Sequence, residues 1–169
     1  MMNINQIILD SIELIKEKCK EEGRKLPLLI YENDLNCLLF SELNKRLEKQ
    51  FIITTELYSG HKDYKKNARI DMALFKNDKV EFKKTNGVPD SLNPKEFEAL
   101  IELKMYWKMN KQKLIEELKG NLEYLKGFKK NTTLKYLICF DYNGHLSHIE
   151  KKNLDVEGIN FVYVNLKNI

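Results

Sequence analysis

Charged side chains interrupt two apolar runs of this chain, and their types and spacing indicate a particular chemistry. Asp71 lies within ARIDMALF, and Glu102 and Lys104 lie within EALIELKMYW. Both runs have the composition of β-strands. A charge at a position that would otherwise face a core costs free energy unless it is paired or binds a metal. Two strands that each present charge at one point therefore predict a metal-dependent hydrolytic site.

The alternation of side chains along a strand assigns these charges to a common face. Glu102 and Lys104 lie on one face of their strand, and Leu103 lies on the other. If the two strands are neighbours, Asp71 and Glu102 meet, and their mutual repulsion calls for a neutralising cation. Hard oxygen ligands suit Mg²⁺ or Mn²⁺, to which the carbonyl of Leu103 would add another oxygen. Lys104 would stabilise developing charge or position the attacking water.

Hydrophobic periodicity predicts the elements that position these residues. Helices are expected at 4–20, 33–49 and 110–127, and strands at 51–57, 68–75, 97–107, 133–140 and 159–166. Between the second and third strands, VEF is expected to extend the sheet and NGVPDSLNP to form a loop. This order predicts one α/β domain spanning residues 1–169, with a mixed sheet of about five strands flanked by helices.

The charge distribution favours a polyanionic partner. The chain has 169 residues and a net charge of +4. Between His61 and Lys135 there are 18 Lys and Arg against 11 Asp and Glu. Because this basic segment contains the charged strands, it predicts binding of phosphates and hence of nucleic acid. Arg69, Lys65, Lys66 and Lys108 are the expected nucleic-acid contacts, although solvated surface lysines would give a similar composition.

Cysteine usage and hydropathy bear on the compartment. The chain has three cysteines without metal-ligand spacing, and Cys37 and Cys139 lie in apolar runs that predict core positions. An odd number of cysteines and no secretion signal predict a reducing, cytoplasmic environment. No apolar stretch approaches membrane-spanning length, so no membrane partner is expected.

At this point the residues resemble a known family. Asp71 followed by Glu102-Leu103-Lys104 is similar to the signature of the PD-(D/E)XK, or restriction endonuclease-like, nuclease superfamily. The element order resembles that family's α-β-β-β-α-β core over residues 30–140, with an N-terminal helix in 1–25 and an extension of the sheet in 141–169. The resemblance implies a Mg²⁺- or Mn²⁺-dependent nuclease, most simply a DNA endonuclease. It also implies that Glu32, near the start of a helix, helps bind the metal.

The sequence leaves two points of this resemblance open. Asp71 follows Ile70 and not a proline, whereas a literal Pro89-Asp90 occurs in the segment expected to be a loop. Asp71 is the favoured metal ligand because a Pro-Asp dipeptide in a loop more often makes a turn. Glu56 matches an acidic residue of some family members, but a structural role is the favoured interpretation for it.

Other functions also fit these residues. A catalytically silent module of the same fold would bind nucleic acid or a protein, and a small α/β interaction domain would need no site. The apolar face of the helix at 4–20 could form a homodimer, which would suit a double-strand cutter. Tyr106 and Trp107 directly follow the Glu102–Lys104 motif, where they could stack on a base, although packing in a core or interface is the favoured interpretation.

Overall fold

The computed structural model describes residues 3–22, 31–47, 50–58, 69–85, 88–94, 96–107, 109–128 and 132–167. Seven strands and four α-helices occupy most of these residues, with a short 3₁₀ turn at Asn77–Lys79. The helices are α1 (Ile4–Glu22), α2 (Glu32–Leu47), α3 (Lys111–Lys126) and α4 (His148–Asn153). The strands are β1 (Phe51–Tyr58), β2 (Arg69–Lys76), β3 (Val80–Thr85), β4 (Val88–Pro94), β5 (Phe97–Tyr106), β6 (Thr132–Asp141) and β7 (Asn160–Asn165).

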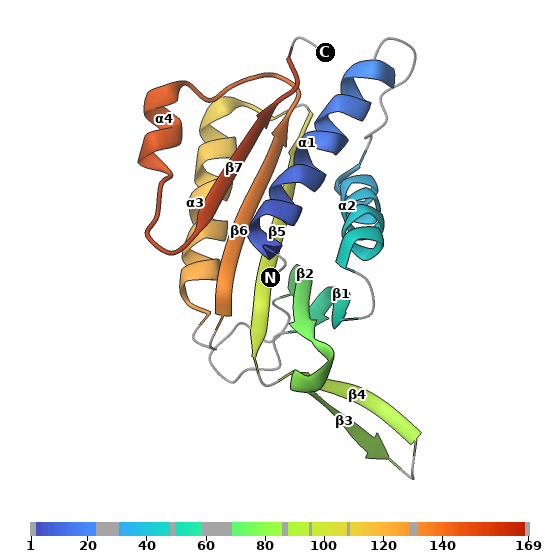
Figure 1. Cartoon of the computed structure of the whole chain (residues 1–169). Coiled ribbons are helices and arrows are strands. Elements are labelled where there is room, and N and C mark those ends of the chain that lie inside the picture. Colours follow the sequence, from blue (N-terminus) through green and yellow to red (C-terminus); the bar gives the residue numbers. More distant parts are fainter. Residues whose placement is uncertain are drawn as a thin grey trace.

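A five-stranded mixed sheet forms the centre of the fold, in the order β1-β2-β5-β6-β7 (Figure 1). β1, β2 and β5 are antiparallel, whereas β5, β6 and β7 are parallel. The parallel pairs require crossover connections, which α3 and α4 supply. The α/β class and the mixed five-stranded sheet predicted from the sequence are therefore confirmed.

Two hydrophobic clusters cover the two faces of this sheet. One contains the buried faces of α1 and α2, including Ile8, Ile12 and Leu39. The other contains the leucine stripe of α3, which is Leu114, Leu118, Leu122 and Leu125. The continuous apolar composition of β6 follows from this arrangement, because both of its faces are covered.

The connection between β2 and β5 differs from the sequence expectation. VEF does not extend the main sheet, and VPDSLNP is a strand rather than part of a loop, because β3 and β4 pair with each other as a separate hairpin; the preceding Asn86 and Gly87 lie outside the described residues. This hairpin projects away from the end of the main sheet (Figure 1). The register shifts between Lys83 and Lys84, opposite Asp90, and a two-stranded ribbon tolerates the neighbouring Pro89 because both strands are edges.

The surfaces of α1 and α2 correct two further expectations. Ile8, Ile12 and Ile15 are at most 1% exposed inside the chain's own core, so the apolar face of α1 is not available to a second copy. Cys37 is exposed, because it lies on the side of α2 opposite the buried Leu35 and Leu39.

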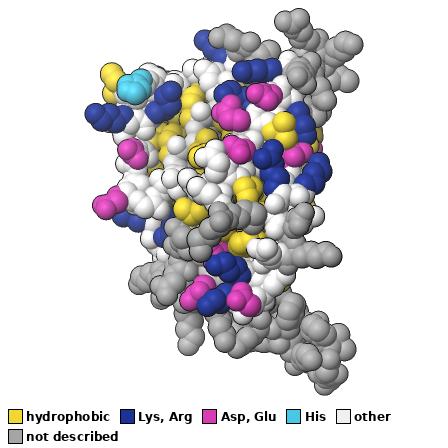
Figure 2. All heavy atoms as spheres, viewed as in Figure 1, with side chains coloured by type: hydrophobic (Ala, Val, Ile, Leu, Met, Phe, Trp, Pro, Cys, Tyr) yellow, Lys and Arg dark blue, Asp and Glu magenta, His cyan; other side chains and the backbone are white. Residues whose placement is uncertain are grey.

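The surface is mixed in charge, and no membrane span is found among the described helices. On the face of the molecule that Figure 2 shows, positive and negative side chains are intermixed. None of the described helices is long and apolar enough to cross a membrane.

Gly120 offers a test of how α3 is built. A methyl group added at Gly120 would meet none of the described atoms within 4 Å. Gly120→Ala is expected to raise the free energy of unfolding by about 0.5–1 kcal/mol, because alanine loses less backbone entropy in a helix. Chemical denaturation followed by circular dichroism measures this change.

Gly144→Ala is the matched control of opposite sign. Gly144 has φ +62°, and its added Cβ would lie 2.8 Å from Asn165 Oδ1, so this variant should be less stable than the wild type. Equal stability of the Gly120→Ala protein and the wild type would contradict the expected gain.

Candidate functional site

The site lies where β2 and β5 part. These strands pair in register only from Met72↔Ile101 to Leu74↔Ala99. Beyond Met72, a side chain replaces the backbone as the hydrogen-bond acceptor: the backbone N–H of Leu103 donates to Asp71 Oδ2 at 2.7 Å. Continuing the register by one residue places Asp71 opposite Glu102, as the strand alternation predicted. The opening between the two strands thereby brings the predicted side chains together.

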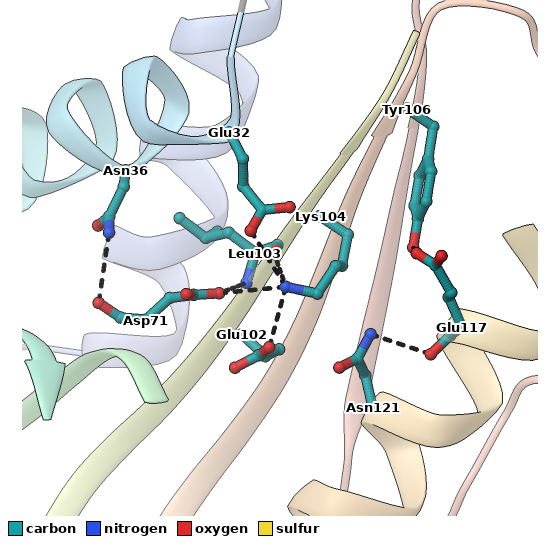
Figure 3. A network of polar contacts seen from close by, with 9 residues as sticks. All are labelled: Glu32, Asn36, Asp71, Glu102, Leu103, Lys104, Tyr106, Glu117 and Asn121. Carbon is teal, nitrogen blue, oxygen red and sulfur yellow. Dashed lines mark hydrogen bonds and ion pairs between the residues drawn. The ribbon is translucent and has the colours of Figure 1, made fainter. Parts of the chain in front are cut away.

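Lys104 lies at the centre of this group (Figure 3). Its ammonium nitrogen Nζ lies 3.0 Å from Glu102 Oε1 and 3.6 Å from Asp71 Oδ2. The same nitrogen lies 3.2 Å from Glu32 Oε1 and donates to the Leu103 carbonyl at 2.7 Å. All five residues that the sequence analysis assigned to catalysis or metal binding therefore meet around one atom.

Helix α2, which covers one face of the sheet together with α1, carries Glu32 to the site. The helix begins at Glu32, and the backbone N–H of Tyr31 donates to Asp34 Oδ2, which satisfies a group at the helix start. One turn along, Asn36 Nδ2 donates to the backbone carbonyl of Asp71 at 3.5 Å, the outer limit of a hydrogen bond. Asn36 was not predicted, and it ties the start of α2 to β2 beside the carboxylates.

Burial changes the acidity of the central pair. Glu102 is 6% exposed, and desolvation raises its pKa to about 7 against the opposing attraction of Lys104. The negative charge of Asp71 adds to this increase. Burial alone would lower the pKa of Lys104, but attraction to Glu102, Asp71 and Glu32 outweighs it, so that pKa is raised. The site therefore holds a permanent cation among carboxylates that repel one another.

The oxygen atoms of the site suit a divalent cation in their chemistry. Glu102 Oε2 is buried and has no hydrogen-bond partner among the described residues. Fully ionised, the three carboxylates and one ammonium carry a formal charge of −2, which a divalent cation would neutralise. However, no group of three or more His, Cys, Asp or Glu in the described part of the chain is arranged to hold a metal. The carboxylates surround the Lys104 ammonium, so a metal would need that ammonium to withdraw.

The remaining sequence-predicted residues lie apart from this group or outside the described residues. Arg69 begins β2, two residues before Asp71, and is exposed. Asp90 lies in β4, which pairs with β3 in a separate two-stranded sheet and not in the sheet that carries Glu102. Glu56 belongs to β1, and its side chain lies outside the described residues. Lys65, Lys66 and Lys108 also lie outside the described residues.

The cysteine beside the site has no catalytic character. Cys139 of β6 pairs in register with Lys104. It is fully buried, and burial raises the pKa of its thiol, so the thiol stays protonated and packs as a small hydrophobic group. In the same hydrophobic cluster as Cys139, the Tyr106 hydroxyl donates to Glu117 Oε2 at 3.4 Å (Figure 3). Desolvation raises the pKa of Tyr106, so this hydroxyl also remains protonated.

A second polar cluster, centred on Asp141, was not predicted. Asp141 ends β6 and is 0% exposed. Its carboxylate accepts hydrogen bonds from the backbone N–H groups of Asn143 and His145 at 2.8 and 2.7 Å and from the Tyr163 hydroxyl at 2.7 Å. His145 Nδ1 lies 3.1 Å from the same carboxylate, although the sequence suggested no partner for this histidine. An aspartate directly after an apolar strand and before an Asn-Gly turn is the signal that could have indicated this cluster.

Comparison of the chain with family models, with curated proteins and with solved structures finds no match. The resemblance to the PD-(D/E)XK superfamily therefore rests on the residues of this chain alone. It stays a prediction, and the activity that it implies is argued below as a proposal.

Proposed function

We propose that this chain is a metal-dependent nuclease that hydrolyses phosphodiester bonds, with DNA as its substrate. The observation that carries the proposal is the meeting of Glu32, Asp71, Glu102 and the Leu103 carbonyl around Lys104 Nζ. These groups come from α2, β2 and β5; gathering buried charge at such a junction costs desolvation free energy, and clusters of this kind are concentrated at functional sites. A purely structural ion pair would not need three carboxylates.

The element order supports a restriction endonuclease-like arrangement. Helix α2 precedes three antiparallel strands, of which the second carries Asp71 and the third carries Glu102 and Lys104. The β3–β4 hairpin is inserted between the second and third strands. A crossover helix and a parallel strand, α3 and β6, follow. This is the order on which the resemblance was based.

The residues divide the proposed chemistry among them. Asp71, Glu102, the Leu103 carbonyl and Glu32 would hold Mg²⁺ or Mn²⁺. A bound metal of this kind lowers the pKa of a water molecule and neutralises charge on a phosphoryl group. Lys104 would donate from Nζ to a phosphate oxygen or to the attacking water. The side chain of Lys104 is 16% exposed, so its ammonium can exchange a carboxylate partner for the substrate.

A panel of nucleic acids tests this activity. The protein would be incubated with single-stranded, duplex and branched DNA and RNA in buffer containing Mg²⁺, Mn²⁺ or EDTA. The proposal predicts fragments of at least one DNA substrate in Mg²⁺ or Mn²⁺ and none in EDTA. Intact substrates under every metal condition would contradict it.

A catalytically silent nucleic-acid-binding module is the second candidate. Two observations favour it. Among the described residues, no three His, Cys, Asp or Glu are arranged to hold a metal. The Lys104 ammonium occupies the space between the carboxylates, where a metal would bind. In that case the lysine is a permanent structural counter-ion. Nucleic-acid binding without cleavage in the panel would select this candidate.

Lys104→Met separates these two roles of the lysine. Methionine keeps most of the side-chain volume but removes the cation, leaving an excess of negative charge. For a nuclease, we expect Mn²⁺ to bind at least as tightly as to the wild type, while cleavage falls by about 10²–10³-fold. Isothermal titration calorimetry and a cleavage assay measure the two effects.

Lys76→Met is the matched control, because Lys76 forms an ion pair with Glu98 away from the site. It should leave both the Mn²⁺ affinity and the cleavage rate unchanged. If the Lys104→Met protein cleaves as fast as the wild type, Lys104 has no catalytic role.

A further inference from the structure

An exposed aromatic pair lies at the end of the strand that carries the site. Trp107 follows β5 directly and is 40% exposed, and it is the only tryptophan in the chain. Its ring centroid lies 4.7 Å from that of Tyr142, with the planes tilted by 56°. This is the contact distance of packed aromatic rings, and it leaves part of the indole open to solvent.

The Asp141 cluster holds this pair in place. Asp141 accepts the backbone N–H of Asn143, and Asn143 Nδ2 in turn donates to the Trp107 carbonyl at 2.9 Å. The backbone N–H of Tyr142 donates to the Tyr106 carbonyl at 3.1 Å. These bonds fix the backbone on both sides of the two rings, and fixed rings bind a flat ligand at a lower entropic cost.

The pair lies close to the proposed catalytic group. Trp107 is three residues beyond Lys104, which corresponds to about 10 Å along an extended strand. That distance is on the order of three nucleotide steps of a stacked strand. Tyr142 packs against the cluster that α1 and α2 share with the sheet, which is the side from which Glu32 reaches the site.

A second exposed aromatic residue borders the same group. Among the described residues, the exposed large hydrophobic side chains are Tyr31, Trp107 and Ile149. Tyr31 directly precedes Glu32 and is 69% exposed. Tyr31 is therefore adjacent in sequence to a residue of the proposed site, and Trp107 lies three residues beyond Lys104, directly after the strand β5 that carries it.

We propose that Trp107, supported by Tyr142, stacks on an unpaired nucleobase beside the phosphate that is cut. This proposal rests on the proposed function and names its substrate class: nucleic acid with unpaired nucleotides at the site, either single-stranded or branched. A base inside an intact duplex is already stacked on both faces and presents none to the indole. Stacking on aromatic side chains accepts any base, so the pair selects for unpaired strands rather than for sequence.

The fluorescence of Trp107 reports this contact directly, because the chain has no other tryptophan. Wild-type protein in EDTA, which prevents cleavage, would be titrated with three probes: a short single strand, its duplex, and a single strand of the same length in which every nucleotide is abasic. The single strand should quench the fluorescence. The abasic strand should bind about 10-fold more weakly and leave the fluorescence unchanged.

Variants of the pair give a second measurement. Trp107→Ala should weaken binding of the single strand by about 10-fold or more, with little change for the duplex, as measured by fluorescence anisotropy of labelled probes. Trp107→Phe should retain part of the affinity, because a smaller ring still stacks. Equal affinity of the wild type for the normal and abasic strands would overturn the proposal without any substitution. Unchanged fluorescence at saturation would do the same.

The outcomes separate this proposal from the proposed function. Cleavage in Mg²⁺ together with unchanged fluorescence in EDTA would leave the nuclease proposal standing and refute the stacking contact. Quenching by the single strand but not by the abasic strand, without cleavage in Mg²⁺, would support the stacking contact and refute the activity. Unchanged fluorescence with all three probes, together with no cleavage in Mg²⁺, would refute both proposals.

Discussion

Glu102→Gln is expected to reduce metal-dependent cleavage by at least about 10²–10³-fold. The side chain of Glu102 is 8% exposed, and its buried Oε2 has no hydrogen-bond partner among the described residues, so this oxygen has the lone pairs free to bind a cation. Glutamine has nearly the same shape but lacks the negative charge that a metal requires. Cleavage of the preferred substrate would be measured in Mg²⁺ at equal protein concentrations.

Glu98→Gln is the matched control for this variant. Glu98 lies on the same strand, four residues earlier, and forms an ion pair with Lys76 at 3.0 Å. Its side chain is 21% exposed and does not contact Lys104. Cleavage by the Glu98→Gln protein should equal that of the wild type. If Glu102→Gln cleaves as fast as this control, Glu102 is not a metal ligand.

Asp141→Asn is expected to lower the free energy of unfolding by about 3–5 kcal/mol. Both carboxylate oxygens of Asp141 accept backbone N–H groups, and the Tyr163 hydroxyl donates to one of them. An asparagine amide would face at least one of these donors with its own N–H₂, leaving a buried donor without a partner. Urea denaturation followed by Trp107 fluorescence and by circular dichroism measures the loss.

Asp155→Asn controls for the change in net charge, because Asp155 is exposed and lies in the same C-terminal part of the chain. It should change the stability by no more than about 0.5 kcal/mol. Tyr163→Phe should lose about 1–2 kcal/mol, since it removes one donor to Asp141 and the acceptor of the Leu146 N–H. A loss for Asp141→Asn no larger than that of Asp155→Asn would contradict the structural role of the cluster.

The same cluster predicts how stability depends on pH. Burial alone would raise the pKa of Asp141, but the hydrogen bonds from Tyr163, His145 and Asn143 together outweigh it, so the pKa is lowered. A carboxylate with a lowered pKa stabilises the fold above its unfolded pKa of about 3.9, and this contribution is lost as the pH falls through the folded value. The wild type should therefore lose stability on acidification below about pH 4. The Asp141→Asn protein should lack this part of the loss.

The main sheet was predictable because the amino-acid composition of each of its strands is typical of a β-strand. β6 is apolar on both faces and β5 carries charge on one face, so composition and alternation identified them and the residues that meet at the site. The β3–β4 hairpin was not predictable in the same way, because Pro89 and Pro94 are typical of loops. Pairing between two edge strands overrides that local preference.

The site was predictable in its members but not in its arrangement. Asp71, Glu102 and Lys104 follow from alternation along strands, whereas the parting of β2 and β5 depends on packing that no local pattern encodes. Asn36 lacked a signal for the same reason, and the Asn-Gly sequence after Asp141 was only an indirect one. Each is a polar residue whose partners are distant in sequence or set by a turn, and a single sequence does not show which turn forms.

Mn²⁺ binding measured by isothermal titration calorimetry tests most directly whether the group around Lys104 is a metal site. For the wild type, we predict a saturable binding event that Glu102→Gln abolishes and that Glu98→Gln leaves unchanged. Either no binding to the wild type or equal binding to the Glu102→Gln protein would contradict a metal-dependent site at Asp71 and Glu102.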